Sequence, residues 1–526
     1  MAEKRGYPIG IQWFPEMIEK KAVYVDKTAY VYKMAHSTGK YFFLIRPRRF
    51  GKSLLVSTLE AFFMGKKELF KGLVIDKMEK DWVKYPVIRL DLSRGKYYNL
   101  DQLISTVSNI LNDYEKTYGL PCSDDLNFSK RLENIIKVAN SQTGHGVVIL
   151  IDEYDAPMLD SIHKPELQEQ IRERVRDLFS PLKSMSEYLR FVFLTGISKF
   201  SQLSVFSELN NLNIMTFNYE YEGICGVTEE ELLTQMKPDI EFLSEELGKS
   251  YDDTVAALKR MYDGYHFSDK MTDIYNPWSL INAFEMRRIG NFWFSTGTPS
   301  SLINLLKVKR LYIPKLEGLQ VRMSQFDAPT ERISDPIPVL YQSGYLTLKA
   351  YDSQSELWTL GFPNEEVRRG FAESLYLYYS DSNWTTYNLV MIAFFKFREK
   401  KITVEEFIEA VRRWYSMIPY SITDKNQNEQ LYQSMLYALL VGIGADVRAE
   451  EQTADGRIDI TLKLDDAIYI IEFKYDKTAE MAVNQIHKKD YAVLFSTDKR
   501  PVYAIGLNID SGKCSIESYK IETISR

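Results

Sequence analysis

The chain is poor in cysteine and histidine, with three cysteines and five histidines in 526 residues. The cysteines, Cys122, Cys225 and Cys514, stand far apart and in no paired spacing. This pattern excludes a disulfide framework and a cysteine-ligated zinc site. The scattered histidines also argue against a histidine-rich metal centre. We therefore expect a protein of the reducing cytoplasm.

The sequence also lacks a long apolar run and an excess of charge of one sign. No stretch of about 18 apolar residues occurs, so we expect no membrane-spanning helix. The N-terminal sequence MAEKRGYPIG lacks the apolar core of a signal peptide. Basic residues number 66 against 72 acidic ones, a formal net charge of -6. Any contact with nucleic acid must therefore come from a local patch of charge.

The composition is that of a globular protein, with 45% hydrophobic and 26% charged residues. Short apolar runs rich in β-formers alternate with segments of helical periodicity in the first part of the chain. This alternation predicts an α/β fold with a mostly parallel sheet covered on both faces. The predicted strands are Tyr41–Ile45, Pro86–Leu92, Val147–Ile151, Arg190–Leu194 and Asn213–Phe217, and the predicted helices include Ser53–Met64, Leu100–Tyr118 and Leu167–Phe179.

The rest of the chain has a different pattern. Residues 225–300 read as helical, and a hairpin is predicted around Leu340–Leu348 and Leu357–Leu360. From about residue 425 the pattern changes to a helix, Asn428–Val441, followed by several strands. We therefore divide the chain into three predicted domains, 1–222, 223–424 and 425–526.

A phosphate-binding loop is indicated where the apolar run YFFLI at 41–45 leads into RPRRFGKS at 46–53 and then into a helical segment. Gly51 would let backbone amides approach phosphates, and the following helix N-terminus supplies partial positive charge. Lys52 would reach the β- and γ-phosphates, and Ser53 would ligate Mg²⁺. Arg46 replaces the first glycine of the usual pattern, and a basic turn that begins a helix is the alternative interpretation.

A second acidic element follows another predicted strand. The run Val147–Ile151 is apolar and ends in Asp152 and Glu153. Ligands of open α/β sheets bind at the carboxyl ends of the strands, where Lys52 and Asp152 would both lie. Asp152 would sit near a nucleotide-bound Mg²⁺, and Glu153 would be the base that activates water. A buried strand with a polar edge is the alternative, but two such elements together favour an ATP site.

Other polar groups join this predicted ATP site. The strand within FVFLTGISKF at 191–200 ends in Thr195 and Ser198, which suit the sensing of a γ-phosphate. The charges of Arg46, Arg48 and Arg49 stand where that phosphate appears and disappears. We expect one or more of these arginines to respond to it.

A pair of carboxylates is predicted near the C-terminus. The segment GRIDITLK at 456–463 alternates strictly and is joined by a turn to a second strand, IYIIEFK at 468–474. Asp459 can lie opposite Glu472, and Lys474 projects from the same face as Glu472. Two carboxylates on adjacent strands suit Mg²⁺ or Mn²⁺, and Lys474 could help to deprotonate a metal-bound water. A half-solvated hairpin with an ordinary Glu–Lys edge is the alternative.

Neighbouring residues could complete this second site. Glu429 lies in the predicted helix before the strands, and either it or Glu450 or Glu451 could add a metal ligand. Downstream, Gln485 and Tyr491 flank the basic run HKK at 487–489. That run could contact a phosphate backbone or form a solvated face.

The motifs of the chain together resemble one family, the bacterial AAA-ATPase-like proteins with a C-terminal PD-(D/E)XK nuclease domain. The N-terminal motifs are YPIG at 7–10, YVDKT at 24–28, RPRRFGKSLL at 46–55, LIDEYD at 150–155, TGISKFS at 195–201 and NNLN at 210–213. The middle motifs are YDGYHF at 262–267, YNPWSL at 275–280 and YQSGYLTL at 341–348. The C-terminal motifs are GRIDI at 456–460, IIEFKYD at 470–476 and NQIHKKDY at 484–491.

This resemblance implies a P-loop NTPase core with a parallel sheet, a helical and winged-helix-like middle region, and a restriction-endonuclease-like α/β domain. It implies that Arg46 is the family's usual residue at the first glycine position and that Ile458 is a tolerated variation of the motif proline. The implied nucleotide-binding residues are Arg48, Arg49, Phe50, Gly51, Lys52, Ser53, Leu54, Asp152 and Ser198. The implied catalytic residues are Glu153, Asp459, Glu472 and Lys474, and the implied metal ligands are Ser53, Asp152, Asp459, Glu472 and Glu429.

The function implied is an ATPase coupled to a metal-dependent nuclease, with ATP and Mg²⁺ (or Mn²⁺ at the nuclease site) as cofactors. The expected partner is nucleic acid, with DNA favoured, in phage defence or mobile-element biology. An ATP-driven switch whose C-terminal domain binds nucleic acid or protein without cutting is the alternative, and RNA cleavage is a weaker one. Assembly into a homo-oligomer stays open.

Overall fold

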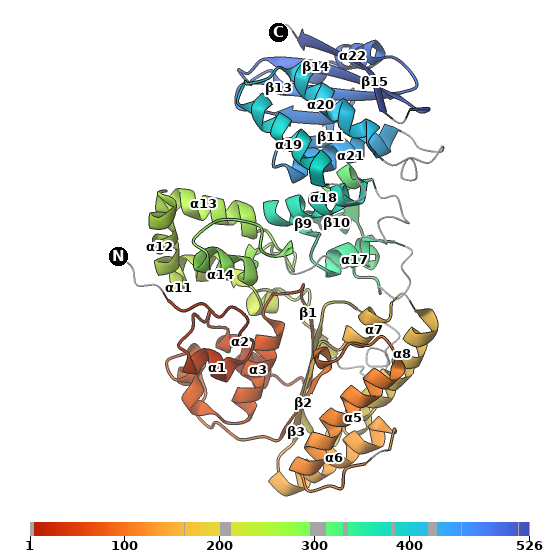
Figure 1. Ribbon diagram of the computed structural model, residues 1–526. Coiled ribbons are helices and arrows are strands. Elements are labelled where there is room, and N and C mark those ends of the chain that lie inside the picture. Colours follow the sequence, from red (N-terminus) through yellow and green to blue (C-terminus); the bar gives the residue numbers. More distant parts are fainter. Residues whose placement is uncertain are drawn as a thin grey trace. The chain divides into compact units, whose positions relative to one another are not determined.

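The computed structural model describes residues 5–123, 125–162, 164–199, 212–294, 312–329, 335–379, 384–418, 429–453, 455–513 and 515–524. The chain divides into two compact units (Figure 1). The first unit comprises residues 1–296 and 320–364, and the second comprises residues 297–319 and 365–526. The chain thus passes between the units three times. The predicted three-domain division at 222 and 424 stays a prediction.

A five-stranded, all-parallel sheet forms the base of the first unit. Its order is β2-β3-β4-β1-β5, with β1 at Tyr41–Ile45, β2 at Val87–Asp91, β3 at Val147–Asp152, β4 at Leu189–Gly196 and β5 at Leu212–Ile214. Strands β1 and β3 are buried throughout, which explains their continuous apolar runs. The last strand ends earlier than predicted, because Ile45 N donates to the side-chain oxygen of Thr216 instead of a backbone carbonyl.

Helices cover both faces of this sheet. Figure 1 shows α1–α3 on one side and α5, α6 and α8 on the other. The bounds are α1 Phe14–Glu19, α2 Thr28–Ala35, α3 Lys52–Phe63, α4 Val74–Met78, α5 Leu100–Thr117, α6 Phe128–Thr143, α7 Ala156–Asp160, α8 Pro165–Phe179 and α9 Pro181–Ser184. An Asn99–Gln102 capping box begins α5. The predicted strand–helix alternation is thereby confirmed.

A helical region follows the sheet in the first unit. Its helices pack around an apolar core that includes Leu243, Leu258 and Leu280. A capping box between Thr228 and Glu231 begins the first of them. The bounds are α11 Glu229–Gln235, α12 Lys237–Leu247, α13 Tyr251–Tyr262 and α14 Pro277–Glu285, with the antiparallel strands β6 Val227–Thr228 and β7 Ile274–Tyr275 beside them.

A small sheet of order β8-β10-β9 lies in the next part of the chain. Its bounds are β8 Leu319–Val321, β9 Thr347–Asp352 and β10 Leu357–Gly361, and the short helices α16 Met323–Phe326 and α17 Ile337–Gln342 precede the hairpin. The hairpin is confirmed, but the prediction of a strand from Leu340 is wrong. Pro338 lies in the first turn of α17, where its missing N–H costs nothing, and Gly344 at φ +87° ends that segment.

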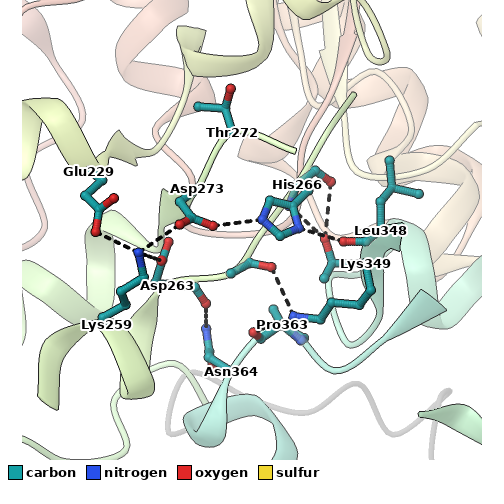
Figure 2. Close-up of polar contacts among 12 residues, drawn as sticks. Glu229, Lys259, Asp263, His266, Thr272, Asp273, Leu348, Lys349, Pro363 and Asn364 are labelled. Atoms are coloured by element: carbon teal, nitrogen blue, oxygen red, sulfur yellow. Dashed lines mark hydrogen bonds and ion pairs between the residues drawn. The ribbon is translucent and has the colours of Figure 1, made fainter. Parts of the chain in front are cut away.

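A network of polar contacts joins the helical region to the β9–β10 hairpin within the first unit (Figure 2). Lys259 on α13 donates to Glu229 at 2.7 Å and to Asp273 at 2.9 Å. His266 Nε2 lies 2.9 Å from Asp273 Oδ1, and its Nδ1 lies 2.7 Å from the carbonyl oxygen of Leu348 on β9. Each ring nitrogen therefore has an oxygen within hydrogen-bond distance, and the two contacts fix the orientation of the ring.

Gly264 allows the closest backbone approach in this network, and we expect Gly264→Ala to destabilise the first unit strongly. Its φ is +89°, and an added Cβ would lie 2.2 Å from the carbonyl oxygen of Pro363. The left-handed backbone costs about 1–2 kcal/mol, and the overlap adds roughly 1–3 kcal/mol. Chemical denaturation gives the free energy of unfolding. Gly248→Ala is the control, because Gly248 has φ +60° and nothing within 4 Å of its Cβ position. Equal losses in both variants would contradict the expectation.

The second unit is built on a five-stranded mixed sheet. The order is β11-β12-β13-β14-β15, and only the β13–β14 pair is parallel. The strands are β11 Asp446–Thr453, β12 Gly456–Lys463, β13 Ile468–Tyr475, β14 Val502–Asp510 and β15 Ser515–Ile524. The helices are α18 Glu365–Tyr379, α19 Trp384–Arg398, α20 Val404–Ser416, α21 Glu429–Gly442 and α22 Ala479–Lys488, the last of which connects β13 to β14.

The predicted fold class is confirmed: a parallel α/β sheet, a helical middle region and a C-terminal mixed sheet follow one another along the chain. In the parts of the chain that are described, no helix combines the length and apolar character needed to cross a membrane. The motif NNLN at 210–213 and the end of TGISKFS at 195–201 lie partly outside the described residues.

Candidate nucleotide and nuclease sites

The loop between β1 and α3 has the geometry of a phosphate-binding loop. Gly51 and Arg49 both have positive φ, at +91° and +66°, and α3 begins at Lys52. The Lys52 ammonium is buried and donates to the carbonyl oxygens of Arg46 at 3.0 Å and Pro47 at 2.9 Å. Burial lowers the pKa of Lys52. Phosphate oxygens are stronger acceptors for an ammonium than carbonyls are, so this lysine is well placed for an anionic ligand.

The Arg46 side chain binds backbone groups inside the protein. Its side chain is fully buried and donates to the carbonyls of Ile45, Thr216 and Tyr221, at 2.9, 3.0 and 3.3 Å. The guanidinium carbon also lies 3.9 Å from the ring centre of Phe267. Burial lowers the pKa of Arg46 to about 10. Both Nη groups of Arg46 thus serve backbone carbonyls, and its buried Nε has no partner among the described residues. The expectation that Arg46, Arg48 or Arg49 responds to the γ-phosphate stays a prediction.

Asp152 lies buried at the end of β3, close to the loop. Its side chain is within hydrogen-bond reach of Ser53, and Arg89 on β2 places one guanidinium nitrogen 3.4 Å from Oδ2. Burial raises the pKa of Asp152 to about 6, and the charge of Arg89 opposes this rise. Oδ1 has no partner in the described part of the chain. The carboxylate is thus held by one oxygen and offers the other.

Arg89 and Asp155 are site residues that the sequence interpretation missed. Arg89 also contacts Glu60 at 3.1 Å, and an arginine inside an apolar strand is the signal that could have identified it. Asp155 is fully buried, and its Oδ2 accepts from the backbone N–H groups of Ile197 at 2.9 Å and Ser198 at 2.6 Å. Burial raises the pKa of Asp155 to about 6. These bonds fasten the end of β4 to the acidic end of β3.

A cavity of about 510 Å³ opens over the loop, within the roughly 300–1,000 Å³ typical of small-molecule sites. All the predicted loop residues from Arg48 to Leu54 line it, and so does Glu153. Asp152 and Ser198 are buried next to it and do not line it. Its apolar lining includes Ile11, Val25, Ile224, Val227, Met236 and Leu280. A polar end at the loop and an apolar end beyond it suit a nucleotide.

The second predicted site is assembled on β12 and β13. Asp459 Oδ2 accepts from the backbone N–H of Phe473 at 2.8 Å, which places Asp459 beside Glu472. Lys474 Nζ lies 3.2 Å from Glu472 Oε1 and 2.7 Å from the carbonyl oxygen of Phe473. Gln485 on α22 donates to the same Oε1. All three predicted catalytic side chains are therefore brought together, and each is buried.

The electrostatics of this cluster favour a cation. Burial raises the pKa of Asp459, and the charge of Glu429 adds to the rise. Burial also raises the pKa of Glu472, and the charge of Asp459 raises it further. Glu472 Oε2 is buried without a partner among the residues described. Two buried carboxylates with an unpartnered oxygen are hard donors that fit Mg²⁺ or Mn²⁺.

The third metal ligand predicted from the sequence, Glu429, lies outside the pair formed by Asp459 and Glu472. The described residues contain no group of three or more Asp, Glu, His or Cys side chains ready to hold a metal ion. Glu429 lies within electrostatic reach of Asp459 and accepts from Gln433 Nε2 at 3.3 Å. Glu450 is instead bound to Arg457 at 2.6 Å, and Glu451 lies 3.4 Å from Arg448. Glu429 is thus the best placed of the three predicted candidates.

The residues of the basic run at 487–489 differ in their contacts and in their exposure to solvent. His487 pairs with Glu522 on β15 at 2.9 Å, and Lys488 is exposed. Gln485 Nε2 lies 3.4 Å from the hydroxyl of Tyr491. Gln485 therefore connects this helix end to the carboxylate cluster, while Lys488 is exposed and Lys489 is half-buried.

The fold and the two sites define a class: a P-loop ATPase-like protein that carries a restriction-endonuclease-like domain in the same chain. Residues 8–206 match the model of the predicted AAA-ATPase family, and residues 427–519 match the model of the PD-(D/E)XK nuclease superfamily. The chain belongs to the family of AAA-ATPase-like proteins with a C-terminal PD-(D/E)XK nuclease domain. A protein of Azotobacter chroococcum mcd 1, described as an uncharacterized protein in the vnfD 5' region, is 31% identical over 534 residues and is covered to 99%, as is this chain.

Two solved structures show only a distant likeness. The ORC2 protein of Aeropyrum pernix, solved as ADPNP–ADP complexes, matches with 12% identity and a TM-score of 0.26, over 64% of this chain and 88% of that one. The ORC1 protein of Aeropyrum pernix, solved in complex with DNA, matches with 11% identity and a TM-score of 0.25, over 69% and 96%. Likeness at this level carries no conclusion for this chain.

Proposed function

We propose that this protein binds and hydrolyses ATP and that its C-terminal domain is a Mg²⁺-dependent nuclease that hydrolyses phosphodiester bonds in DNA. The observation that supports this most is the buried cluster of Asp459, Glu472 and Lys474. Burying two carboxylates without pairing both is costly, and such clusters are typical of functional sites. A role in phage defence or mobile-element biology is part of the proposal.

At the nuclease site, Asp459 and Glu472 would hold the divalent ion, and Glu429 would approach it as a third ligand. The ion supplies activation of water and stabilisation of phosphate charge. Lys474 stands beside Glu472, where its ammonium can orient the attacking water and stabilise charge on the phosphate. Gln485 fixes the Glu472 carboxylate by holding Oε1. A divalent cation would also offset the burial and the repulsion that together raise the pKa of both carboxyls.

At the nucleotide site, Lys52 would bind the β- and γ-phosphates in place of its two carbonyl acceptors. Ser53 and Asp152 would hold the nucleotide's Mg²⁺, and Arg89 would keep Asp152 ionised and correctly turned. Glu153 lines the cavity and would orient and deprotonate the attacking water. Arg48 and Arg49 also line the cavity and remain candidates for sensing the γ-phosphate.

We propose further that ATP regulates cleavage. The three passages of the chain between the two units give several covalent routes for coupling. The physical requirement is that ATP bind two conformations with different affinities, because a ligand with equal affinity shifts nothing.

The test is to incubate the purified protein with supercoiled plasmid, linear duplex, single-stranded DNA and RNA. Each substrate is combined with Mg²⁺, Mn²⁺ or a chelator, and with ATP, ADP or no nucleotide. We expect metal-dependent cleavage of DNA at rates that differ among the three nucleotide conditions, and we expect Lys52→Ala to abolish that difference. Equal rates would mean two independent domains. Binding without cleavage would favour the ATP-driven switch, and cleavage of RNA alone would replace the substrate.

A further inference from the structure

A short segment from outside the C-terminal sequence region contacts residues that lie near the carboxylate cluster. Residues 312–319 belong to the second unit, although the chain on both sides, up to 296 and from 320, belongs to the first. The segment contains the 3-10 helix η6 (Ile313–Leu316), whose Ile313 and Leu316 are buried. Just before it, the hydroxyl oxygen of Tyr312 lies 2.7 Å from Gln433 Oε1 and 2.7 Å from Glu450 Oε1.

This contact reaches the predicted metal site in two steps. Gln433 and Glu429 both lie on α21, one turn apart, and Gln433 Nε2 donates to Glu429 at 3.3 Å. Glu429 in turn lies within electrostatic reach of Asp459. Tyr312, Gln433 and Glu429 therefore form a continuous chain of hydrogen bonds that ends next to the two carboxylates of β12 and β13.

The Tyr312 hydroxyl decides which end of the Gln433 amide faces Glu429. A phenol has one hydrogen to donate, yet this hydroxyl lies equally close to an amide oxygen and a carboxylate oxygen. When the hydroxyl donates to Gln433 Oε1, the amide N–H₂ faces Glu429 and holds that carboxylate. When the hydroxyl donates to Glu450 instead, the Gln433 amide is free to turn. Its oxygen then faces the Glu429 carboxylate, and the two groups repel each other. The same groups thus allow two arrangements, of which the structure holds the first, and the position of Tyr312 selects between them.

We propose that Tyr312 is a positioning residue of the nuclease site and that its segment regulates the third metal ligand, Glu429. This inference rests on the proposed nuclease function. The described chain runs on from Leu319 into residues 320–364 of the unit that carries the ATP site. A conformational change in that unit can therefore reach Tyr312 through the chain. Displacing the hydroxyl would release Gln433, and Asp459 and Glu472 would then be the two carboxylates held in place for a metal ion.

The test compares Tyr312→Phe with Tyr415→Phe in the full-length protein. Tyr312→Phe removes only the hydroxyl. Tyr415→Phe is the matched control, because Tyr415 on α20 donates its hydroxyl to the backbone carbonyl of Tyr432 on α21, the helix that carries Gln433. Among the described contacts, Tyr415 has none with a carboxylate of the cluster. Calorimetric titration with Mn²⁺ alone, without nucleotide, measures metal binding. The heat that is lost in the Glu472→Gln variant is the part that comes from binding at this site. Thermal unfolding checks that each variant is folded.

We expect Tyr312→Phe to weaken Mn²⁺ binding about tenfold, as is typical when an outer partner of a ligand is lost, and Tyr415→Phe to leave it unchanged. Gln433→Ala should weaken binding to the same degree, and the double variant Tyr312→Phe/Gln433→Ala should show no additional loss, because both act through one chain. Unchanged binding in Tyr312→Phe would overturn the proposal. Equal weakening by Tyr415→Phe would also overturn it, since a general loosening of α21 would then be the cause.

Cleavage assays separate this inference from the function on which it rests. If wild-type protein cleaves DNA, Tyr312→Phe should need about tenfold more Mg²⁺ for half-maximal cleavage, and its rates with ATP and ADP should become equal. A rate ratio that is unchanged would overturn the link to the ATP site. If wild-type protein neither cleaves nor binds Mn²⁺, the proposed nuclease itself fails and this inference fails with it.

Discussion

Glu472→Gln is expected to lower the rate of DNA cleavage by about a thousandfold, which corresponds to roughly 4 kcal/mol of lost transition-state stabilisation. Glutamine has nearly the same shape, so the packing against Gln485 and Lys474 can persist. What is lost is a charged oxygen at Oε2, the buried atom that has no partner among the described residues. An amide oxygen is a much weaker ligand for a hard divalent cation than a carboxylate is. Rates are measured on plasmid at saturating Mg²⁺.

Glu522→Gln is the matched control for this variant. Glu522 lies on β15 of the same sheet and pairs with His487 and Lys520 at the surface. The same chemical change there should leave cleavage unaltered. Lys474→Met provides a second contrast, since it should keep Mn²⁺ binding and still lose most turnover. Undiminished cleavage in Glu472→Gln would place the active centre elsewhere.

The raised pKa values of Asp459 and Glu472 add a pH dependence to this site. A carboxyl group must lose its proton before it can bind a metal ion. Because burial raises both pKa values above the ordinary carboxyl range, part of the pair is still protonated at pH values where exposed carboxyls are fully ionised. Metal affinity should therefore increase as the pH rises through the neutral range and decrease on acidification.

The sequence predicted those parts of the fold whose pattern is local. β1 and β3 are buried on both faces, and a continuous apolar run identifies such a strand without knowledge of its neighbours. The segment from Leu340 shows where this fails, because an apolar run of that length fits a short helix equally well and only Pro338 hints at the choice. β5 ended early because a threonine side chain replaced a backbone partner, which no periodicity reveals.

The candidate sites show the same division between local and distant information. The spacing of Gly51, Lys52 and Ser53 indicates a loop that binds phosphate, but it does not tell which way Arg46 points. That side chain is directed by Thr216 and Tyr221, far along the chain. Arg89 and Tyr312 belong to no motif of their own. They become visible only when the fold brings β2 against β3, and the segment after residue 311 against α21.

The other large effect is expected at the nucleotide site, where Lys52→Ala should weaken ATP binding by at least about a hundredfold. The lysine is the only cation that the loop buries among its described residues besides Arg46, whose Nη groups are occupied by carbonyls. Hydrogen bonds to charged groups contribute about 1.5–3 kcal/mol each, and an ammonium that meets two phosphates makes more than one. Titration with a fluorescent ATP analogue in the presence of Mg²⁺ measures the affinity, and thermal unfolding confirms that the variant is folded.

Glu153→Gln should separate binding from hydrolysis at the same site. The side chain lines the cavity, and its backbone has a positive φ of +49°, a conformation that glutamine can keep. The variant should bind ATP as the wild type does, because an amide can still hydrogen-bond a water molecule. It should hydrolyse ATP about 10²–10⁴-fold more slowly, since it can no longer accept that water's proton. Wild-type affinity in folded Lys52→Ala would remove the assignment of this loop. Undiminished hydrolysis in Glu153→Gln would leave the loop as a binding site and assign the base to another group, with the buried Asp155 the next to test.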